Sequence, residues 1–329
     1  MLTILKKNLP YLKALIGLAL LAFVLLWVDW STAFERLGEA KVCWLLLGLG
    51  VVFVGLLLKA LRWGLLLHHF GVKVAPREVL EAYMAGQALN ILLPFRGGEV
   101  VRFGLLSIAA PGQAPESAST IVLEKGLDGL AVSVLAGILL LTLPAAPVSP
   151  AMAQVLPQAG MLLISLLVLF MILFSVWPVI YRWLRKRYAG RWAGLLTRAD
   201  EIAMRWRVWL KSPRQVTPVI ALTLLIWLIM WATNLVIFQS VELNQGGIAA
   251  GMVLALIMVG LLPALMPANI GPFHFFATLA LRPFGVPVEQ GMAFAILLHA
   301  VVTLPTLLIG GAILLLPGRR PRLSDAANI

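Results

Sequence analysis

The sequence predicts an all-α polytopic membrane protein with about six full transmembrane helices and two re-entrant helical hairpins in an inverted repeat. Three observations predict this fold. Of the 329 residues, 61% are hydrophobic and 12% are charged, which is typical of a helical membrane protein. Basic residues gather between the apolar stretches, and proline and glycine interrupt two of those stretches. We expect one integral membrane domain, residues 1–329.

The net charge of +12 does not indicate nucleic-acid binding here, because most of it lies in loops beside the expected spans. We expect a multi-pass protein of the cell (inner) membrane with both termini in the cytoplasm. Cys43 is the only cysteine, so an intrachain disulfide and a Cys-based metal site are excluded. The adjacent His68 and His69 are a poor chelating pair, and we expect no metal and no cofactor.

Residues 1–41 contain the first span (12–28) and an outer loop (29–41). Lysines near the N-terminus place that end in the cytoplasm. We expect the span to be retained, because no small-residue cleavage site follows it. The next span begins at Val42 and runs to about Leu61, and the cytoplasmic side should receive it with Arg62, Lys73 and Arg77.

The first hairpin, residues 79–109, lies within repeat 1 (42–141). Glu81 to Leu93 favours a helix that Pro94 ends, and Gly97-Gly98 permit a sharp reversal before a second helix from Glu99 to about Ala109. Each arm would be about 20 Å long, short of the ~30 Å hydrocarbon core. A non-helical tip that carries Arg96 and Glu99 at this depth needs surrounding protein or water, which makes it a candidate site. The alternative is a cytoplasmic loop between two surface helices.

The span that follows, residues 119–141, carries Glu124, Lys125 and Asp128. Glu124 and Asp128 are four residues apart and share one helix face, while Lys125 can pair locally. Charges facing lipid at mid-depth cost about 2.5–3.5 kcal/mol each, so this face should look toward the hairpin and pair with Arg96 or Arg102. A cluster that reaches the membrane interface is the alternative.

Residues 142–215 contain an uncharged, proline-rich outer loop (142–158), a linking span (160–181) and a strongly basic segment. The segment 182–214 holds ten Lys or Arg against two acids. Its apolar residues recur at helical spacing and predict a helix that lies on the inner leaflet, either as an orienting anchor or as a specific grip on anionic head groups. They are Trp192, Leu195, Leu196, Ala199, Ala203, Trp206 and Leu210.

Repeat 2, residues 216–316, begins with a span (216–240) and ends with another (about 290–316). Between them, hairpin 248–283 is broken at Pro267-Ala-Asn-Ile-Gly-Pro272. The arginines of the tail, residues 317–329, belong in the cytoplasm only if this segment turns back instead of crossing. Both hairpins have proline and glycine four residues apart and would enter from opposite faces, as in an inverted repeat.

Several blocks of the sequence resemble the lysylphosphatidylglycerol synthase transmembrane family over about residues 10–316. They are Arg62-Trp63, Asn90-Ile-Leu-Leu-Pro94, Arg96-Gly-Gly-Glu-Val-Val-Arg102, Glu124-Lys-Gly-Leu-Asp128 and Pro267-Ala-Asn-Ile-Gly-Pro-Phe-His274. The resemblance implies flippase-like movement of lipid, with membrane lipids of anionic, polyprenyl or hopanoid type as ligands. No soluble domain follows Pro317, so aminoacyl transfer is not carried over, and we expect no enzymatic activity.

The candidate substrate-binding residues form one group around the two hairpin tips. Arg96 and Arg102 offer planar forks for phosphate, and the helix after Gly98 offers free N–H groups. Glu99 and the acids of span 119–141 would hold the arginines or carry protons, and Asn269 would cap the second short helix. The full set is Asn90, Arg96, Gly97, Gly98, Glu99, Arg102, Glu124, Lys125, Asp128, Asn269, Gly271 and His274.

Two other classes of function share parts of this pattern. A non-transporting accessory subunit of a lipid or envelope assembly system would use the buried charges for assembly alone. A membrane glycosyltransferase would need acids in an external loop, and no Asp-x-Asp pair is present. A second copy of the chain or an envelope-biogenesis protein is the expected kind of protein partner.

Overall fold

The computed structural model is a bundle in which every regular element of the described residues is a helix. It describes residues 2–93, 97–142, 193–261 and 266–315, with short pieces between 165 and 187. The predicted loop 142–158 and the tail fall almost wholly outside these ranges, as does most of the linking span 160–181. In chain order the elements are α1 (Leu2–Trp27), α2 (Trp30–Gly38), α3 (Val42–His69), α4 (Pro76–Leu92), α5 (Gly98–Ala109), α6 (Ala114–Thr142), α8 (Ala193–Leu210), α9 (Pro213–Ser240), α10 (Gly247–Gly260), η3 (Pro267–Asn269), α11 (Pro272–Leu281), η4 (Arg282–Phe284) and α12 (Val288–Leu315).

Three of these helices, α3, α9 and α12, are long and apolar enough to cross a membrane. Each has 28 residues, about 42 Å at helical rise. A fourth span results if α1 and α2 are counted together across their 82° bend. The chain is therefore an all-α polytopic membrane protein, and the number of six full spans stays a prediction.

The predicted outer loop 29–41 is in fact mostly helical, because α2 occupies most of it. Asp29 is its N-cap and accepts a hydrogen bond from the Ser31 backbone N–H at 3.0 Å. Ala33 is wholly buried and clusters with Met292 of α12. The N-terminal helices are thus tied to the rest of the bundle through this contact.

The helices predicted for the arms of both hairpins are present and pack in pairs, α4 with α5 and α10 with α11, while their re-entry into the membrane stays a prediction. The first arm, α4, ends where the sequence predicted. Leu93 has an extended backbone (ψ 140°), as expected for a residue before proline. Helix α5 begins at Gly98, one residue before the predicted start.

The reason for the glycine pair in the first hairpin differs from our prediction. Gly97 has a helical backbone (φ −59°), so no special turn geometry is needed there. Gly98 instead permits close approach, because a Cβ at this position would collide with the carbonyl oxygen of Gly86 and the backbone nitrogen of Asn90. The two arms cross at Gly86 and Gly98 with almost no space between their backbones.

The second break does use unusual backbone geometry. Ala268 and Asn269 have φ of 51° and 54°, and Gly271 has φ of 89°. Gly271 is the N-cap of α11 and Pro272 its first residue. The prediction that Asn269 caps this helix is wrong, because its backbone belongs to η3 and leaves the cap to Gly271.

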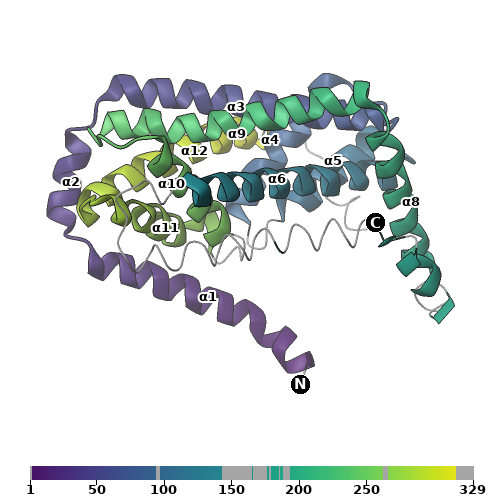
Figure 1. Ribbon diagram of the computed structural model, residues 1–329, viewed down its shortest axis with the longest axis horizontal. Coiled ribbons are helices and arrows are strands. Elements are labelled where there is room, and N and C mark those ends of the chain that lie inside the picture. The colour runs from purple at the N-terminus through teal and green to yellow at the C-terminus, as the bar shows by residue number, and fades with distance from the viewer. Residues whose placement is uncertain are drawn as a thin grey trace.

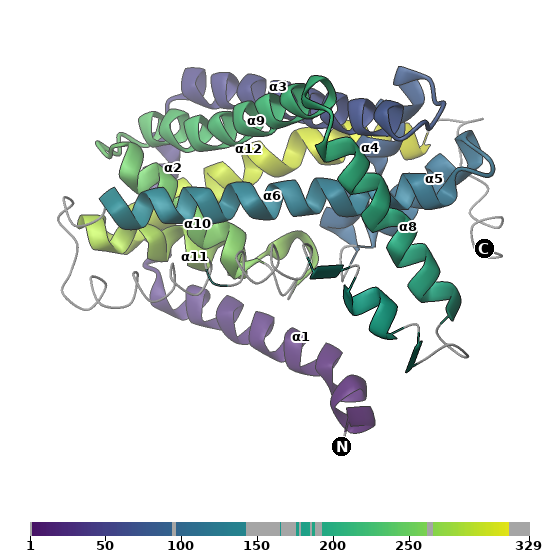
Figure 2. The ribbon, with the colours of Figure 1, turned by 45° about the vertical axis from the view of Figure 1, so that its right-hand side comes forward.

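The two halves repeat one order of elements: a long helix, two short helices and a second long helix. Helices α3 and α9 lie side by side along one edge of the molecule (Figures 1 and 2). Each hairpin packs against the other half, α4 against α12 and α10 against α6. The halves are therefore interlocked, and α4 of the first hairpin contacts η3 of the second.

Helix α8 crosses the end of the bundle (Figure 2) and packs against α6 and α9. Arg205 of α8 forms an ion pair of 2.7 Å with Glu116. Ala203 of the predicted apolar stripe is buried against the bundle together with Trp209, which was not in the stripe, whereas Leu210 is half-exposed. The inward face of α8 therefore covers protein, and contact of its outer face with the inner leaflet stays a prediction.

Candidate functional site

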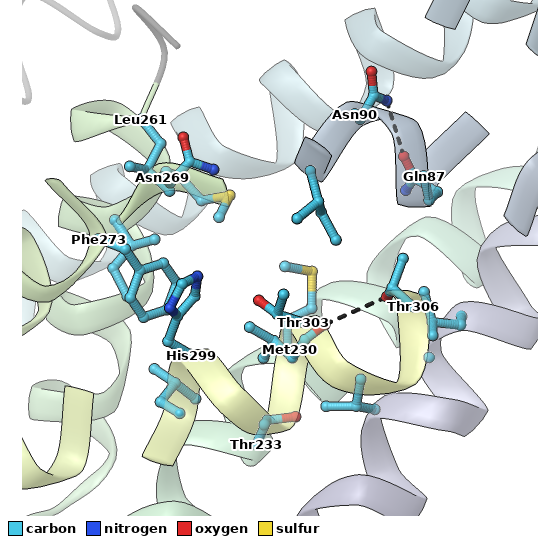
Figure 3. Close-up of a pocket in the computed structure, with 18 of the residues that line it drawn as sticks. Gln87, Asn90, Met230, Thr233, Leu261, Asn269, Phe273, His299, Thr303 and Thr306 are labelled. Atoms are coloured by element: carbon cyan, nitrogen blue, oxygen red, sulfur yellow. Dashed lines mark hydrogen bonds between the residues drawn. The ribbon is translucent and has the colours of Figure 1, made fainter. Parts of the chain in front are cut away.

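A cavity of about 320 Å³ lies where the two hairpins meet. Figure 3 shows Gln87 and Asn90 of α4 on one side and Asn269, Phe273 and His299 on the other. Long helices from both halves complete the wall. A space of this size and position is typical of a small-ligand site between helices of a bundle.

The charged and the apolar residues of the cavity wall come mainly from different halves of the chain. The charged side chains come from α3, α5 and α6, namely Lys59, Glu99 and Lys125. Other polar side chains come from both halves, and they are Gln87, Asn90, Thr233, Asn234, Asn269, His299, Thr303 and Thr306. Apolar side chains come mainly from α9 to α12, and include Met230, Leu254, Ile257, Phe273, Leu298 and Val302. The wall is therefore complementary to an amphiphilic molecule, with a polar group at one end and hydrocarbon at the other.

The charged part of the wall contains an ion pair between the first hairpin and α6. The Nζ of Lys125 lies 2.6 Å from Oε1 of Glu99, which also accepts a hydrogen bond of 2.9 Å from the Asn90 side chain. Lys125 therefore pairs with Glu99 of α5. The prediction that it pairs locally, with its neighbours on α6, is wrong. Its side chain is 44% exposed, so this pair is open to the cavity.

Behind this wall lies a buried network of charges. Glu124 shares its two oxygens between two arginines, Oε2 with Arg102 and Oε1 with Arg62 at 3.3 Å. Arg62 also binds Asp128 through two hydrogen bonds of 2.8 and 3.2 Å. Glu124 is 1% exposed and Asp128 28%, so both acids face protein, while the depth of this cluster in the membrane stays a prediction. The acids of α6 thus hold arginines in place, one of the two roles predicted for them.

Arg102 has the predicted partner but not the predicted access to a ligand. Its guanidinium lies 3.7 Å from the ring centre of Trp63 and 4.8 Å from that of Tyr83. The side chain is 1% exposed and does not line the cavity. The described structure therefore places Arg102 as a support of the first hairpin, where its aromatic and acidic neighbours enclose it.

Arg62 was placed wrongly by the sequence, since we expected it to mark the cytoplasmic end of a span. Helix α3 continues to His69, and Arg62 is wholly buried within it. Two signals were available. Two acids on a single face of α6 need more than one cation, and Arg62-Trp63 is one of the blocks that resemble the family. The sequence did not show how α3 is placed along α6, so the partners of Arg62 could not be named.

Lys59 is the other cation that sequence reasoning missed. It lies one turn before Arg62 on α3, within the apolar run, and lines the cavity. The face it shares with Val52, Gly55 and Leu56 repeats at three and four residues, and all four line the cavity. A lysine inside a predicted span was the available signal.

The second hairpin contributes backbone and ring contacts near the apolar part. His299 of α12 lies 2.9 Å from the carbonyl oxygen of Ala268 and so connects α12 with the strained break. His274 does not line the cavity and packs edge-on against His299 at 4.9 Å between ring centres. Gly271 lies against Leu21 of α1, which a Cβ would approach to 2.9 Å.

Of the predicted residues, Asn90, Glu99, Lys125 and Asn269 line the cavity. Arg102, Glu124 and Asp128 form the network behind it, and Gly97 and Gly98 serve the backbone of the hairpin. Arg96 is not among the residues that the structure describes, so its contact with phosphate stays a prediction. Within the described ranges, no three potential metal ligands gather at one place.

A comparison with protein families decides the identity of this helical arrangement. The family model described as the lysylphosphatidylglycerol synthase TM region matches residues 14–310. The chain belongs to this family. A search of curated proteins gave no match.

In this member of the lysylphosphatidylglycerol synthase TM-region family, the matched range takes in both hairpins, the buried network and every residue that lines the cavity. The resemblance inferred from short blocks is thereby confirmed over most of the chain. The cavity is formed by the region that the family shares.

Proposed function

We propose that this protein binds the anionic or phosphate-bearing head group of a membrane lipid in the central cavity and moves it across the bilayer. One observation carries the proposal: the cavity lies between the two hairpins, takes its charged side chains from α3, α5 and α6, and takes most of its apolar side chains from α9 to α12. A membrane lipid likewise has a polar head group and apolar hydrocarbon chains. Membership of a lipid-related membrane family supports the choice of ligand.

The proposed translocation requires the hairpins to separate in turn, so that the head group reaches one leaflet and then the other. Two contacts hold the hairpins at the cavity. The Glu99–Lys125 pair joins α5 to α6, and the contact of His299 with the Ala268 carbonyl joins α12 to η3. Lys125 is 44% exposed and Glu99 19%, so this pair is less enclosed than the network behind it and is the one we expect to open. The anionic oxygens of a bound head group can replace the carboxylate of Glu99 as the partner of Lys125.

The buried network has a different part in this proposal. Arg62 and Arg102 share Glu124, so α3, α5 and α6 remain connected while the pair at the cavity opens. Breaking a buried pair is costly, on the order of 3–5 kcal/mol. We therefore expect the network to stay intact and to act as a fixed support for the first hairpin.

A cavity-filling variant tests the proposal. Thr303→Trp on α12 places a large ring in the cavity, whereas Leu304→Trp places the same ring on a side chain that is 50% exposed. In reconstituted vesicles that contain fluorescent lipids, we expect Thr303→Trp to abolish transbilayer movement and Leu304→Trp to retain it. Both variants should elute as folded protein.

The same pair of variants separates transport from an accessory role. If Thr303→Trp is folded, moves no lipid and yet complements a deletion strain, the protein acts without transport and the proposal fails. If wild-type protein in vesicles moves no lipid of any head group, the proposal also fails. Loss of complementation in Thr303→Trp alone supports it.

A further inference from the structure

The charged groups of the cavity and of the network behind it are paired, with the exception of one lysine that is described below. Three cations, Arg62, Arg102 and Lys125, face three carboxylates, those of Glu99, Glu124 and Asp128. Each of these six groups lies within 4.0 Å of at least one group of opposite charge. Their charges therefore cancel within the described structure.

Lys59 stands outside this balance. Among the described residues it forms no ion pair within 4.0 Å and no side-chain hydrogen bond. The carboxylates of Glu124 and Asp128 are bound by Arg62 and Arg102 and form no ion pair with Lys59. The cavity wall thus keeps one lysine that no described carboxylate pairs.

The position of Lys59 excludes the usual explanation for a lysine in a span. A lysine that faces lipid extends along the helix to the membrane surface. Lys59 instead faces the cavity together with Val52, Gly55 and Leu56 on the same side of α3. Its ammonium group is therefore available to whatever occupies the cavity.

We propose that Lys59 is an anion-binding residue of the central cavity and that the site favours a head group with a net negative charge, such as a phosphodiester. This inference rests on the proposed function and names its ligand class. Lys59 contacts the anionic oxygens, and Asn90 and Lys125 line the cavity from the same half of the chain. The hydrocarbon chains face the apolar side chains of α9 to α12.

The charge count also predicts which lipids are rejected. A zwitterionic head group carries its own cation and leaves the charge of Lys59 uncompensated overall. A lipid esterified with lysine has a net positive head group, which Lys59 repels. The site should therefore prefer a phosphodiester over both of these lipids.

Equilibrium binding tests this selection without requiring transport. The full-length protein is placed in nanodiscs that contain equal parts of phosphatidylethanolamine, phosphatidylglycerol and lysyl-phosphatidylglycerol, and retained lipid is measured by native mass spectrometry. We expect wild type to enrich phosphatidylglycerol over both other lipids. Lys59→Met should reduce this preference about tenfold, the size expected for one charge-assisted contact, and Lys59→Arg should keep it.

Two controls make the test specific. Lys73→Met removes an exposed lysine of the loop after α3, distant from the cavity wall, and should leave the preference unchanged. Soluble glycerophosphoglycerol, which has the head group without the chains, should not displace the lipid. Displacement by this compound or by inorganic phosphate would overturn the assignment to a lipid.

The outcomes distinguish this inference from the proposed function. Transport with the same lipid preference in Lys59→Met and wild type overturns the role of Lys59 and leaves the proposed transport standing. Enrichment of phosphatidylglycerol that depends on Lys59, in a protein that moves no lipid, supports the binding site and overturns transport. Absence of any enrichment in wild type overturns the charge selection.

Discussion

Glu124 is the residue on which the first half of the site depends, because one carboxylate serves two buried arginines. Its two oxygens face Arg62 and Arg102 from different helices. Charges at such a position are tolerated only when they are paired. Loss of this one acid affects the contacts of α3 and α5 with α6 at once.

We expect Glu124→Gln to lower the free energy of unfolding in detergent by about 3–5 kcal/mol, because the charge of Arg102 loses its main partner while it remains buried. Glu116→Gln on the same helix is the matched control. Glu116 pairs with the half-exposed Arg205, and its loss should change stability by less than about 1 kcal/mol. Equal effects of the two variants in a denaturant titration would contradict the structural role of Glu124.

Some of this network was predictable and some was not. The pair of Arg102 and Glu124 followed from two facts in the sequence: charges inside a span need partners, and these groups lie on neighbouring elements. Arg62 and Lys59 were not recovered, since their roles depend on how far α3 extends and on its rotation against α6 and α9. Those quantities are set by packing between distant segments and leave no local pattern.

At the scale of elements, the first hairpin depends on contact between two backbones. Gly98 faces the carbonyl oxygen of Gly86 on the opposite arm. Sequence reasoning found the hairpin from Pro94 and the glycines but assigned the glycines to a turn. A glycine pair is expected both for a sharp turn and for the close approach of two helices. Only the position of the other arm distinguishes these two reasons.

We expect Gly98→Ala to destabilise the protein by about 1–3 kcal/mol, because the added methyl group must push α4 and α5 apart. Gly126→Ala, at a helical position with open space around it, is the control and should be neutral or slightly stabilising. Thermal unfolding of the two variants compares them directly. A neutral Gly98→Ala would show that the arms do not cross as described.

The cap of α2 gives a prediction for pH. Hydrogen bonds from the hydroxyls of Ser31 and Thr32 hold the pKa of the Asp29 carboxyl below its ordinary value of 3.8. A lowered pKa in the folded state means that this contribution is complete above pH 3.8 and is lost as the pH falls through the lowered value. Protection of the α2 amides against hydrogen exchange, relative to their intrinsic exchange rate at each pH, should therefore fall below that range. Asp29→Asn, which caps without titrating, should remove the dependence.

At the scale of the whole molecule, the two halves share one order of elements and pack against each other, while their inverted orientation in the membrane stays a prediction. After replacement of the exposed Cys43 by alanine, single cysteines report the side on which a position lies. We expect labelling at Glu242 from outside and at Ser212 and Ser324 from inside. Labelling of Ser324 from outside would contradict the orientation of the second hairpin.

The common order of elements in the two halves was recognisable from the sequence, since both breaks needed to turn back for the basic loops to lie on one side. The packing of each hairpin against the opposite half was not recognisable. It joins residues as distant as Met84 and Gly310, where a Cβ on the glycine would collide with the Met84 carbonyl oxygen. A contact of this kind needs a small residue, but the sequence does not say which helix approaches it.

The packing of each hairpin against the opposite half has a consequence for biosynthesis. Helix α4 enters the membrane early, but its packing partner α12 is the last described helix to be made. During translation the first hairpin must therefore wait in an incomplete pocket, with its buried charges held by α3 and α6 alone. The central cavity cannot exist until the final span is inserted. A ribosome stalled before α12 would hold a chain that has most of its membrane helices but no site.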